Sequence, residues 1–458
     1  MGVTSRLAGF AVNTTFEDLP APVVAISKEM MLNAAGIGLA GSEEREGQII
    51  TEYVKAMGGR PASTVIGASF RSSPESAALA NGTMVHVLDF DENVERRANH
   101  PSNAMFPTVM AIGEHLGCSG QAVTAAFAVG CEVSTKLGAA GDLDAQFPRI
   151  SGFGWHPQGV TGTFGATAAA GKLLGLDQAQ MENAFGLACS QAAGLQVNFA
   201  TSSKSLHPGS AAMRGIMCAT LAQKGFTGAR NGIEGERGFF EAYRRDRNLD
   251  DDEFIERLGT PYDVIDPGLR LKIYPCGSLA HVSLEAILYL VGEHKIQYEQ
   301  VQAIRVSVPR RWGLTGSAIT HPQTGLEGKF SMAYCMAVAV VYGTPQLQHF
   351  TDQAVRDPKL VSLLDKVTVV TDEVPTATAS RPSTVTITLN DGREVSRREE
   401  YAKGDRHKPV TAKDIDDKFA TCSHHLLGPE LMKEVILRFR TLDEIRDVRP
   451  LFASLAVG

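Results

Sequence analysis

The chain has 458 residues, a length that predicts two domains rather than one simple core. Its 43% hydrophobic and 21% charged residues are typical of an ordinary soluble globular protein, and its formal net charge of −7 argues against a nucleic-acid binder, which usually carries a basic excess. The seven cysteines are scattered and odd in number, so the sequence predicts no disulfide framework and no zinc or iron–sulfur site.

The same features give expectations about location and partners. Cysteines without a pairing pattern favour a reducing, intracellular location, and we expect a cytoplasmic protein. The N-terminus lacks the charged-then-apolar pattern of a secretory signal. No apolar run reaches the roughly 18 residues of a membrane span. The sequence therefore predicts neither a membrane nor a nucleic acid as a partner.

The first 265 or so residues are predicted to be helical almost throughout. Asp18 and Pro20 mark the start of a helix that runs to Ala40 and ends at Gly41. Apolar periodicity predicts further helices at residues 43–57, 73–90, 107–116, 121–137, 161–174 and 177–194. The small residues of 162–171 indicate helices in close backbone contact. They are no dinucleotide fingerprint, because no strand precedes them and no acidic residue follows at the required spacing.

From about residue 268 the pattern changes. Residues 301–308, 367–371 and 383–389 alternate as strands do, and residues 390–392 then predict a hairpin turn. Helices are predicted among them at 281–293 and 330–343, and a linker at 403–409. Helices at 414–422, 430–437 and 442–455 follow, and we expect them to pack on the first domain. The prediction is a mainly α protein, with a helical domain over 1–267 and 405–458 and a smaller α+β domain over 268–404.

Three carboxylates lie within four residues of an otherwise apolar stretch, at Asp89, Asp91 and Glu92. Charged groups are rarely taken out of water unless they are paired or used chemically. On a continuing helix His86 and Asp89 would share a face, and a partly buried carboxylate can act as a base or hold an imidazole in one tautomer. The alternative is a solvated helix end. We expect Asp89 to be functional, and Asp91 and Glu92 to be structural or rim residues.

Four further residues could carry charge or protons to a site. His100 and His156 each precede a proline, which favours an extended backbone and a loop position, although two such pairs among twelve histidines could arise by chance. Lys204 is predicted in a polar loop between two helices, and Lys272 at the junction between domains, where ligand clefts are common. The alternative for either lysine is an exposed surface position. Together these groups could clamp a di- or tricarboxylate against the acidic background.

Other site classes find less support in the sequence. Aspartates and histidines could ligate a divalent ion, but no H-x-x-x-H or comparable pair places two ligands on one helix, so no metal site is predicted. The G-x-S-x-G elbow of a serine hydrolase is absent, and nothing beside Cys276 marks it as an activated nucleophile.

Taken together, these segments resemble the MmgE/PrpD family, which includes 2-methylcitrate dehydratases, cis-aconitate decarboxylases and iminodisuccinate epimerases. The resemblance covers nearly the whole chain. It is carried by the order and spacing of several motifs rather than by any single one. Among these motifs are residues 19–20, 36–41, 88–92, 100–101, 156–157, 204–209, 272–276 and 330–334.

The resemblance implies a large all-helical domain made from both ends of the chain and a smaller α+β lid. It also implies a homodimer, and a cleft between the domains that needs no metal or organic cofactor. The family's active-site pattern falls on Asp89, His100, His156, Lys204, Lys272 and Tyr334, and the first five are predicted to be catalytic. The residues predicted to bind substrate are Asn93, Ser203, His281 and Tyr334.

The chain departs from the family pattern at two points. Where the family often shows D-F-D-D-T, Asn93 replaces the threonine and alters a hydrogen bond to the substrate. Gly277 and Ser278 stand where some decarboxylases carry a bulkier group, which disfavours decarboxylation of cis-aconitate. The function implied is therefore a cofactor-independent lyase that abstracts a proton next to a carboxylate of a small polycarboxylate, as a 2-methylcitrate dehydratase-like hydro-lyase would. The alternatives are an epimerase of an iminodisuccinate-like imino acid, a cis-aconitate decarboxylase and a non-catalytic carboxylate-binding protein.

Overall fold

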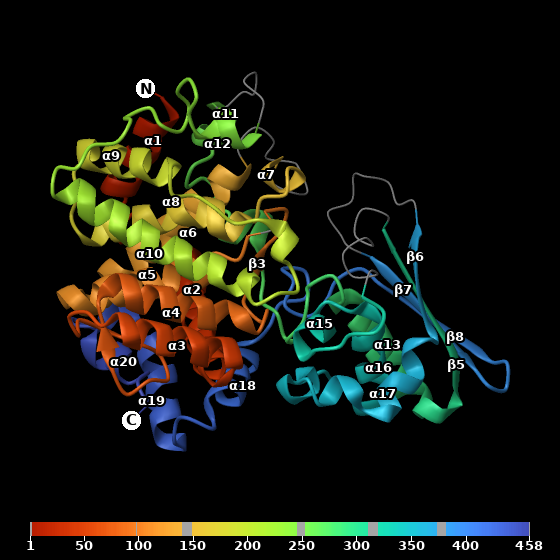
Figure 1. Ribbon diagram of the computed structural model, residues 1–458. Coiled ribbons are helices and arrows are strands. Elements are labelled where there is room, and N and C mark those ends of the chain that lie inside the picture. The colour runs from red at the N-terminus through yellow and green to blue at the C-terminus, as the bar shows by residue number, and fades with distance from the viewer. Residues whose placement is uncertain are drawn as a thin grey trace. The chain divides into compact units, whose positions relative to one another are not determined.

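A computed structural model describes residues 2–97, 99–139, 149–244, 252–309, 319–372 and 382–457. The chain divides into two units (Figure 1). Unit 1 comprises Met1–Arg270 and Thr411–Gly458, and unit 2 comprises Leu271–Val410. The described residues of unit 1 form helices, connecting segments and two pairs of very short strands, and those of unit 2 combine helices with a four-stranded sheet. The predicted fold class, mainly α with a smaller α+β part, is confirmed.

Closely packed helices form the centre of unit 1 (Figure 1). They are α2 (Ala21–Glu43), α4 (Pro74–Val87), α5 (Ser102–Leu116), α6 (Gly120–Ala139), α8 (Pro157–Leu173) and α10 (Ser203–Gln223). Helix α10 packs against α8 and α4, and α6 packs against α8. A Cβ atom added at Gly82 would lie 2.7 Å from the Cα of Gly209, and one at Gly165 would lie 2.5 Å from the carbonyl oxygen of Gly130. The close helix contact predicted for residues 162–171 is therefore present between α8 and α6, and another brings α10 onto α4.

Shorter elements surround these helices. In the first part of the chain they are α1 (Val3–Asn13), α3 (Arg45–Met57), α7 (Arg149–Gly152), α9 (Gln178–Cys189), η1 (Gln196–Asn198), α11 (Phe239–Arg244), α12 (Asp252–Glu256) and η2 (Val264–Gly268). Strand β1 (Ser63–Thr64) pairs with β2 (Arg71–Ser72), and β3 (Asn93–Val94) pairs with β4 (Leu269–Arg270). From the end of the chain, α18 (Ala412–Ser423) and α19 (Pro429–Arg440) pack on α2, while α20 (Arg449–Ala453) packs on α5.

Helix α5 and the last predicted helix are two of the places where the extent of a helix differs from the sequence prediction. Helix α5 begins at Ser102 rather than near Pro107, because the Glu92 carboxylate accepts the Ser102 N–H at 2.9 Å and so caps a free amide of the first turn. The single helix predicted for 442–455 is instead a 3₁₀ turn, η6 (Leu442–Glu444), followed by α20. The backbone between them is bonded to the start of α6, since the Gly120 N–H donates to the carbonyl of Ile445 at 2.8 Å.

Helix α2 is long and apolar enough to cross a membrane by length and composition alone. In the fold, 72% of its most apolar stretch is buried, and it packs against α4 and α18. This burial within unit 1 is how the core helix of a folded domain behaves.

Unit 2 is built on a sheet with the strand order β6–β5–β7–β8. Strand β5 (Val301–Pro309) runs parallel to β6 (Val367–Asp372) and antiparallel to β7 (Ser383–Leu389), and β7 forms the predicted hairpin with β8 (Glu394–Glu399). The parallel pair needs a long crossover, which the elements between β5 and β6 supply. Helices α13 (His281–His294) and α16 (Met332–Tyr342) pack against the sheet, as Figure 1 shows. The other elements in the described part of unit 2 are η3 (Tyr298–Gln300), α15 (Gly325–Lys329), η4 (Leu347–Phe350), η5 (Ala354–Arg356) and α17 (Pro358–Leu364).

Candidate active site

A buried cluster of polar side chains in unit 1 is centred on His86, in the last turn of α4. We name it the His86 cluster; its members are His86, Asp89, Asp91, His100, His156, Lys204 and His207. The Nδ1 atom of His86 lies 2.8 Å from Asp91 Oδ2, and its Nε2 atom lies 2.8 Å from Lys204 Nζ. An ionised carboxylate only accepts hydrogen bonds and an ammonium only donates them, so His86 carries its proton on Nδ1 and presents the Nε2 lone pair to Lys204.

Burial also sets the charge of His86. Its side chain is fully buried, and this desolvation lowers the pKa of His86 despite the opposing effect of the Asp91 carboxylate. The Lys204 ammonium lowers that pKa further. His86 is therefore a neutral imidazole near neutral pH. In the sequence His86 stands out only as a helical neighbour of Asp89, whereas in the structure it is the hub of the cluster.

Lys204 joins His86 to Asp89, because its Nζ atom also donates to Asp89 Oδ1 at 2.7 Å. Asp89 adopts a left-handed backbone with φ of +51°, just after the end of α4. The predicted loop position of Lys204 is wrong, because Lys204 is the second residue of α10. The polar residues around Lys204 predicted a loop, but the packing of α10 against α4 and α8 outweighs their local preference.

Asp91 and Glu92 are both fully buried, so the prediction that they could be rim residues is wrong. Asp91 Oδ2 accepts a hydrogen bond from the side chain of Asn103 at 2.9 Å as well as from His86. Glu92 has the structural role that the sequence allowed, because its carboxylate accepts both the N–H and the hydroxyl of Ser102 at the start of α5. Asn103 was missed, since one asparagine in a helix gives no sequence signal.

Two of the predicted histidines lie beside His86. The ring centroid of His86 is 5.4 Å from that of His100 and 5.9 Å from that of His156. His100 Nδ1 also lies 3.5 Å from Asp91 Oδ2. His156 stands at the N-cap of α8 with the extended backbone that its following proline favours. The structure thus brings Asp89, His100, His156 and Lys204 together, as a site would require.

His156 has a further partner that the sequence analysis missed. Its Nδ1 atom lies 2.8 Å from Nδ1 of His207, so one of the two rings donates a proton to the other. Burial lowers the pKa of His156 well below its ordinary value, and Lys204 lowers it further. Burial likewise lowers the pKa of His207 to about 4. Both rings are neutral near pH 7, which allows the donor–acceptor contact between them.

Phe199 forms an apolar wall of the cluster. Its ring lies edge-on to that of His156, with centroids 4.9 Å apart, and the Nζ atom of Lys204 is 5.9 Å from its centroid. An apolar wall lowers the local dielectric and strengthens electrostatic interactions with a bound anion. Phe199 follows η1 in a loop, a position that gave no sequence signal.

The acceptor atoms of His86, Asp89 and Asp91 all lie within 4.8 Å of one another, so these three side chains could hold a metal ion. The Lys204 ammonium, however, already contacts His86 Nε2 and Asp89 Oδ1. A metal ion would have to displace that cation. The geometry therefore fits a cluster that donates and accepts protons better than it fits a metal centre.

Two of the predicted substrate-binding residues also lie in unit 1. Asn93 is in β3 and is 3% exposed, and no described residue provides a hydrogen-bond partner for its Oδ1 atom. Ser203, the first residue of α10, is half-buried next to Lys204. Their contacts with a substrate stay predictions.

The other three predicted residues belong to unit 2. Lys272 is buried close to the start of this unit. His281 begins α13 and donates from Nε2 to the carbonyl of Cys276 at 3.2 Å. Tyr334 lies in the hydrophobic core, where its hydroxyl donates to the carbonyl of His349 at 2.6 Å and burial raises its pKa. The catalytic or binding roles of these residues also stay predictions.

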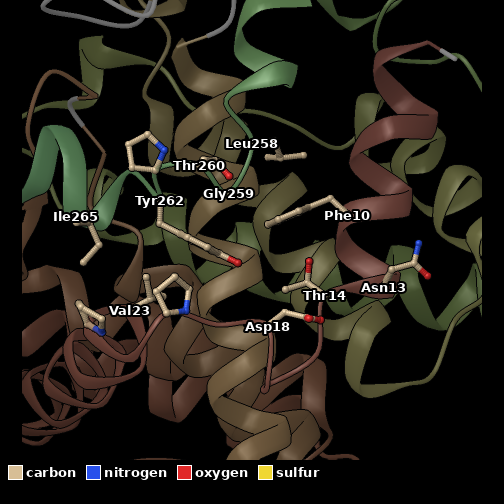
Figure 2. Close-up of a pocket in the computed structure, with 13 residues that line it drawn as sticks. Phe10, Asn13, Thr14, Asp18, Val23, Leu258, Gly259, Thr260, Tyr262 and Ile265 are labelled. Atoms are coloured by element: carbon tan, nitrogen blue, oxygen red, sulfur yellow. The ribbon is translucent and has the colours of Figure 1, made fainter.

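Unit 1 also contains a separate cavity of about 610 Å³, formed by the end of α1, the start of α2 and residues 258–265 (Figure 2). Its lining is mostly apolar and includes Phe10, Val23, Leu258 and Tyr262. None of the predicted site residues is part of this lining. The cavity is therefore distinct from the His86 cluster.

The fold and the His86 cluster define a mainly α protein with a buried site suited to proton transfer. The model of the MmgE/PrpD N-terminal domain matches residues 5–252, and that of the MmgE/PrpD C-terminal domain matches residues 274–442. The chain therefore belongs to the MmgE/PrpD family, and the predicted resemblance is confirmed.

The chain is also similar over most of its length to proteins named cis-aconitate decarboxylase. It is 28% identical to the one from Mus musculus, over 97% of this chain and 91% of that protein. Identity is 28% to the one from Homo sapiens, over 93% and 88%, and 25% to one from Aspergillus terreus, over 99% and 96%. Family membership and these similarities support a lyase acting on carboxylates, at the level of the family.

Proposed function

We propose that this protein is a cofactor-independent hydro-lyase that eliminates water from a small di- or tricarboxylate after abstracting a proton next to a carboxylate. One observation carries the proposal. The buried ammonium of Lys204 contacts both the neutral His86 imidazole and the Asp89 carboxylate, within a ring of histidines. A fixed cation beside neutral bases is what the formation of an enolate-like anion requires.

Each group has a role in the proposed reaction. His156 takes the proton from the carbon next to the substrate carboxylate, and the resulting imidazolium shares its Nδ1 proton with His207. Lys204 stabilises the negative charge that develops on that carboxylate. The leaving hydroxyl group takes a proton from the imidazolium form of His100 and departs as water, which leaves His100 neutral. After product release His156 gives up its proton and His100 regains one. By the family pattern, Lys272 is a second cation that holds a substrate carboxylate.

Asp91 and Asp89 act through other groups. Asp91 holds His86 in the Nδ1–H tautomer, so that the Nε2 lone pair stays directed at Lys204. Asp89 holds the other side of the ammonium. With both contacts in place, the position of the cation is fixed before substrate binds, which reduces the reorganisation needed during the reaction.

Decarboxylation is the second candidate, because the similar proteins reported above are named cis-aconitate decarboxylases. Loss of carbon dioxide leaves the same kind of carbanion, which Lys204 would stabilise equally well. Against this candidate, Gly277 offers no side chain where the resemblance leads us to expect a bulkier group. A Cβ added there would lie 3.4 Å from the Lys329 carbonyl oxygen, so packing tolerates a side chain and glycine is not required for space.

Proton NMR in deuterated water separates these reactions in one assay. The full chain is incubated with 2-methylcitrate, citrate, cis-aconitate or iminodisuccinate, and we expect elimination of water from a hydroxylated substrate, or its addition in reverse. A product one carbon dioxide lighter would replace this proposal with decarboxylation. Deuterium entering one carbon without elimination would indicate epimerisation. Saturable binding without turnover would indicate a binding protein, and loss of activity on chelation would indicate a metal-dependent enzyme.

A further inference from the structure

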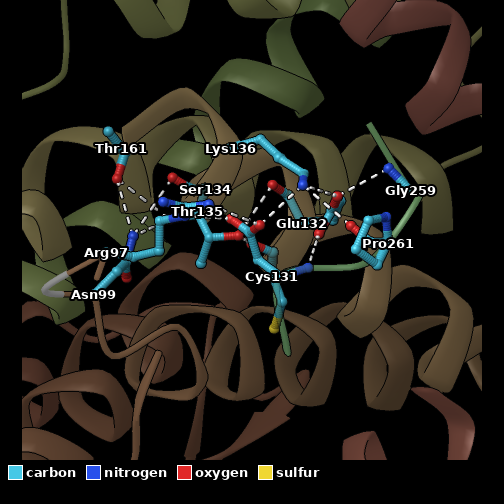
Figure 3. A network of polar contacts seen from close by, with 11 residues as sticks. Arg97, Asn99, Cys131, Glu132, Ser134, Thr135, Lys136, Thr161, Gly259 and Pro261 are labelled. Atoms are coloured by element: carbon cyan, nitrogen blue, oxygen red, sulfur yellow. Dashed lines mark hydrogen bonds and ion pairs between the residues drawn. The ribbon is translucent and has the colours of Figure 1, made fainter. Parts of the chain in front are cut away.

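The segment of residues 94–99 connects two candidate site residues, Asn93 and His100. Its described ends are joined, since the Val94 N–H donates to the Asn99 carbonyl at 2.9 Å, and the Arg97 N–H donates to the Val94 carbonyl at 3.2 Å. We name residues 94–97 and 99 together the 94–99 turn. The Asn99 side chain then donates to the hydroxyl of Ser134 at 2.9 Å, which ties the turn to α6 (Figure 3). The position of His100 therefore depends on what holds this turn.

The strongest contact of the turn comes from Arg97, which is only 5% exposed. Its guanidinium donates to both carboxylate oxygens of Asp263, at 2.8 and 3.3 Å. Lys136 Nζ lies 2.9 Å from Asp263 Oδ1 and donates to the carbonyl of Pro261 at 3.1 Å. Paired bonds from a planar guanidinium fix orientation as well as distance. Asp263 thus links the turn to α6 through two cations.

Glu132 lies one helical turn before Lys136 on α6. Its Oε1 atom is 3.6 Å from the Nζ atom of Lys136. Its two carboxylate oxygens accept the N–H groups of Gly259 and Asp263, each at 2.8 Å. Figure 3 shows Glu132 and Lys136 side by side on α6, facing Gly259 and Pro261. Two cations and two carboxyl groups therefore meet in a buried place, and their contacts fix both the 259–263 loop and the 94–99 turn.

We propose that Arg97, Asp263, Lys136 and Glu132, together named the Arg97 network, form a positioning device that holds the 94–99 turn and thereby sets the place of His100 in the reaction. A buried charge is tolerated only while its partners stay in place, so the network has one low-energy arrangement. Its residues act through the turn and not on the substrate. The kinetic part of this inference rests on the proposed function, and the structural part does not.

Two conservative variants and one matched control test the proposal. Arg97→Lys keeps the charge but cannot form the paired bonds, and Glu132→Gln keeps the shape but leaves one oxygen to accept the two N–H groups that the carboxyl group accepts. The control is Glu114→Gln. Glu114 is also a buried carboxylate that accepts a backbone N–H and pairs with an arginine, but it holds the β1–β2 strands through Thr64 and Arg71.

Hydrogen–deuterium exchange measures how strongly the amides of the 94–99 turn are protected, and this measurement needs no substrate. In Arg97→Lys and Glu132→Gln we expect exchange of the 94–99 amides to rise about tenfold, while exchange in 63–72 stays as in the wild type. Glu114→Gln should show the reverse. With the substrate found by the NMR assay, kcat should fall about tenfold or more in the first two variants and KM should change less, because a misplaced proton donor slows the chemical step.

The outcomes are distinguishable. If no substrate is turned over, the proposed function fails, while faster exchange confined to 94–99 still supports the network. Wild-type exchange and kcat in either folded variant would overturn the proposal. Exchange that rises evenly across unit 1, together with a lower melting temperature, would also overturn it, because the role would then be general stability. If Glu132→Gln does not fold, Arg97→Lys alone decides.

Discussion

The two buried polar clusters of unit 1 differ in the groups from which they are built. In the His86 cluster, burial lowers the pKa values of His86, His156 and His207, which leaves neutral rings able to take up or pass on a proton. In the Arg97 network, Arg97 and Lys136 share the Asp263 carboxylate, and backbone N–H groups donate to the Glu132 carboxyl group. Proton exchange requires groups that can take up or release a proton, whereas positioning requires groups that are held by several directed contacts. Substitutions that disrupt one of the two clusters at a time therefore test these two roles separately.

The largest effect is expected from Asp263→Ala, which removes the carboxylate shared by Arg97 and Lys136. Two buried cations would lose their partner, and breaking a buried pair in this way costs about 3–5 kcal/mol. Urea unfolding measures the change in the free energy of unfolding. Asp443→Ala is the control, because its ion pair with Lys28 is partly exposed and should contribute no more than about 1 kcal/mol. A similar loss in the two variants would mean that the network does not behave as a buried unit.

Lys204→Met should have the largest effect on catalysis. Removing a preorganised group that stabilises developing charge lowers kcat by about 10²–10³-fold. Far-UV circular dichroism should show that the helices remain. Lys172→Met is the matched control, since Lys172 is a half-buried lysine that donates only to the carbonyls of Ala11 and Val12 in α1 among the contacts described. Activity above a tenth of the wild-type value in Lys204→Met would contradict the assignment of Lys204 as the central cation.

Part of the candidate site was predictable from the sequence, and part was not. Asp89 and Lys204 could be nominated one by one, because a carboxylate in an apolar run and a lysine in a distinctive motif are visible locally. Their contact could not be predicted, since it spans 115 residues and depends on the close approach of Gly82 to Gly209. That same packing explains why Lys204 lies in a helix where its flanking residues predicted a loop.

The fold, too, was predictable from the sequence in part. The alternating residues 301–308 and 383–389 predicted β5 and β7, because one face of each strand is buried and the pattern records it. The start of α5 was missed because its cap, Glu92, lies ten residues earlier in the chain than Ser102. Asn103 and His207 were missed for a related reason: their roles come from partners on other segments and leave no local pattern.

A smaller effect on catalysis is expected from Asp91→Asn. An amide can donate to His86 Nδ1, which would place the imidazole proton on Nε2, facing the Lys204 ammonium. Loss of such an orienting partner lowers activity by about 10–100-fold. Glu92→Gln is the control, because it still accepts from Ser102, and its kcat should stay close to the wild-type value. Nitrogen-15 NMR of the histidines should show the tautomer change only in Asp91→Asn. An unchanged tautomer would contradict the role of Asp91.

The mildest test uses pH, to which the two clusters should respond in opposite directions. Histidines whose pKa is lowered in the folded state stay neutral while the unfolded chain takes up protons, so their contribution to stability is lost as pH falls from 6.5 toward the value of about 4 for His207. Glu132 behaves in the opposite way. Burial raises its pKa to about 8, so the folded state holds a proton that the unfolded chain has released above its ordinary 4.5. Its contribution is lost as pH rises toward 8.

Of these two effects, only that of Glu132 remains above pH 6.5, and it should lower the free energy of unfolding by up to about 1.4 kcal/mol per pH unit. Urea unfolding at pH 6.5, 7.0, 7.5 and 8.0 measures this slope, and Glu132→Gln should remove it. Between pH 4.5 and 6.5 the two effects oppose each other. The histidine effect should therefore become visible as a rising slope in Glu132→Gln, and it should weaken when His207→Gln is added. If Glu132→Gln keeps the wild-type slope above pH 6.5, Glu132 is ionised throughout, and the Arg97 network holds its charges fixed at every pH tested.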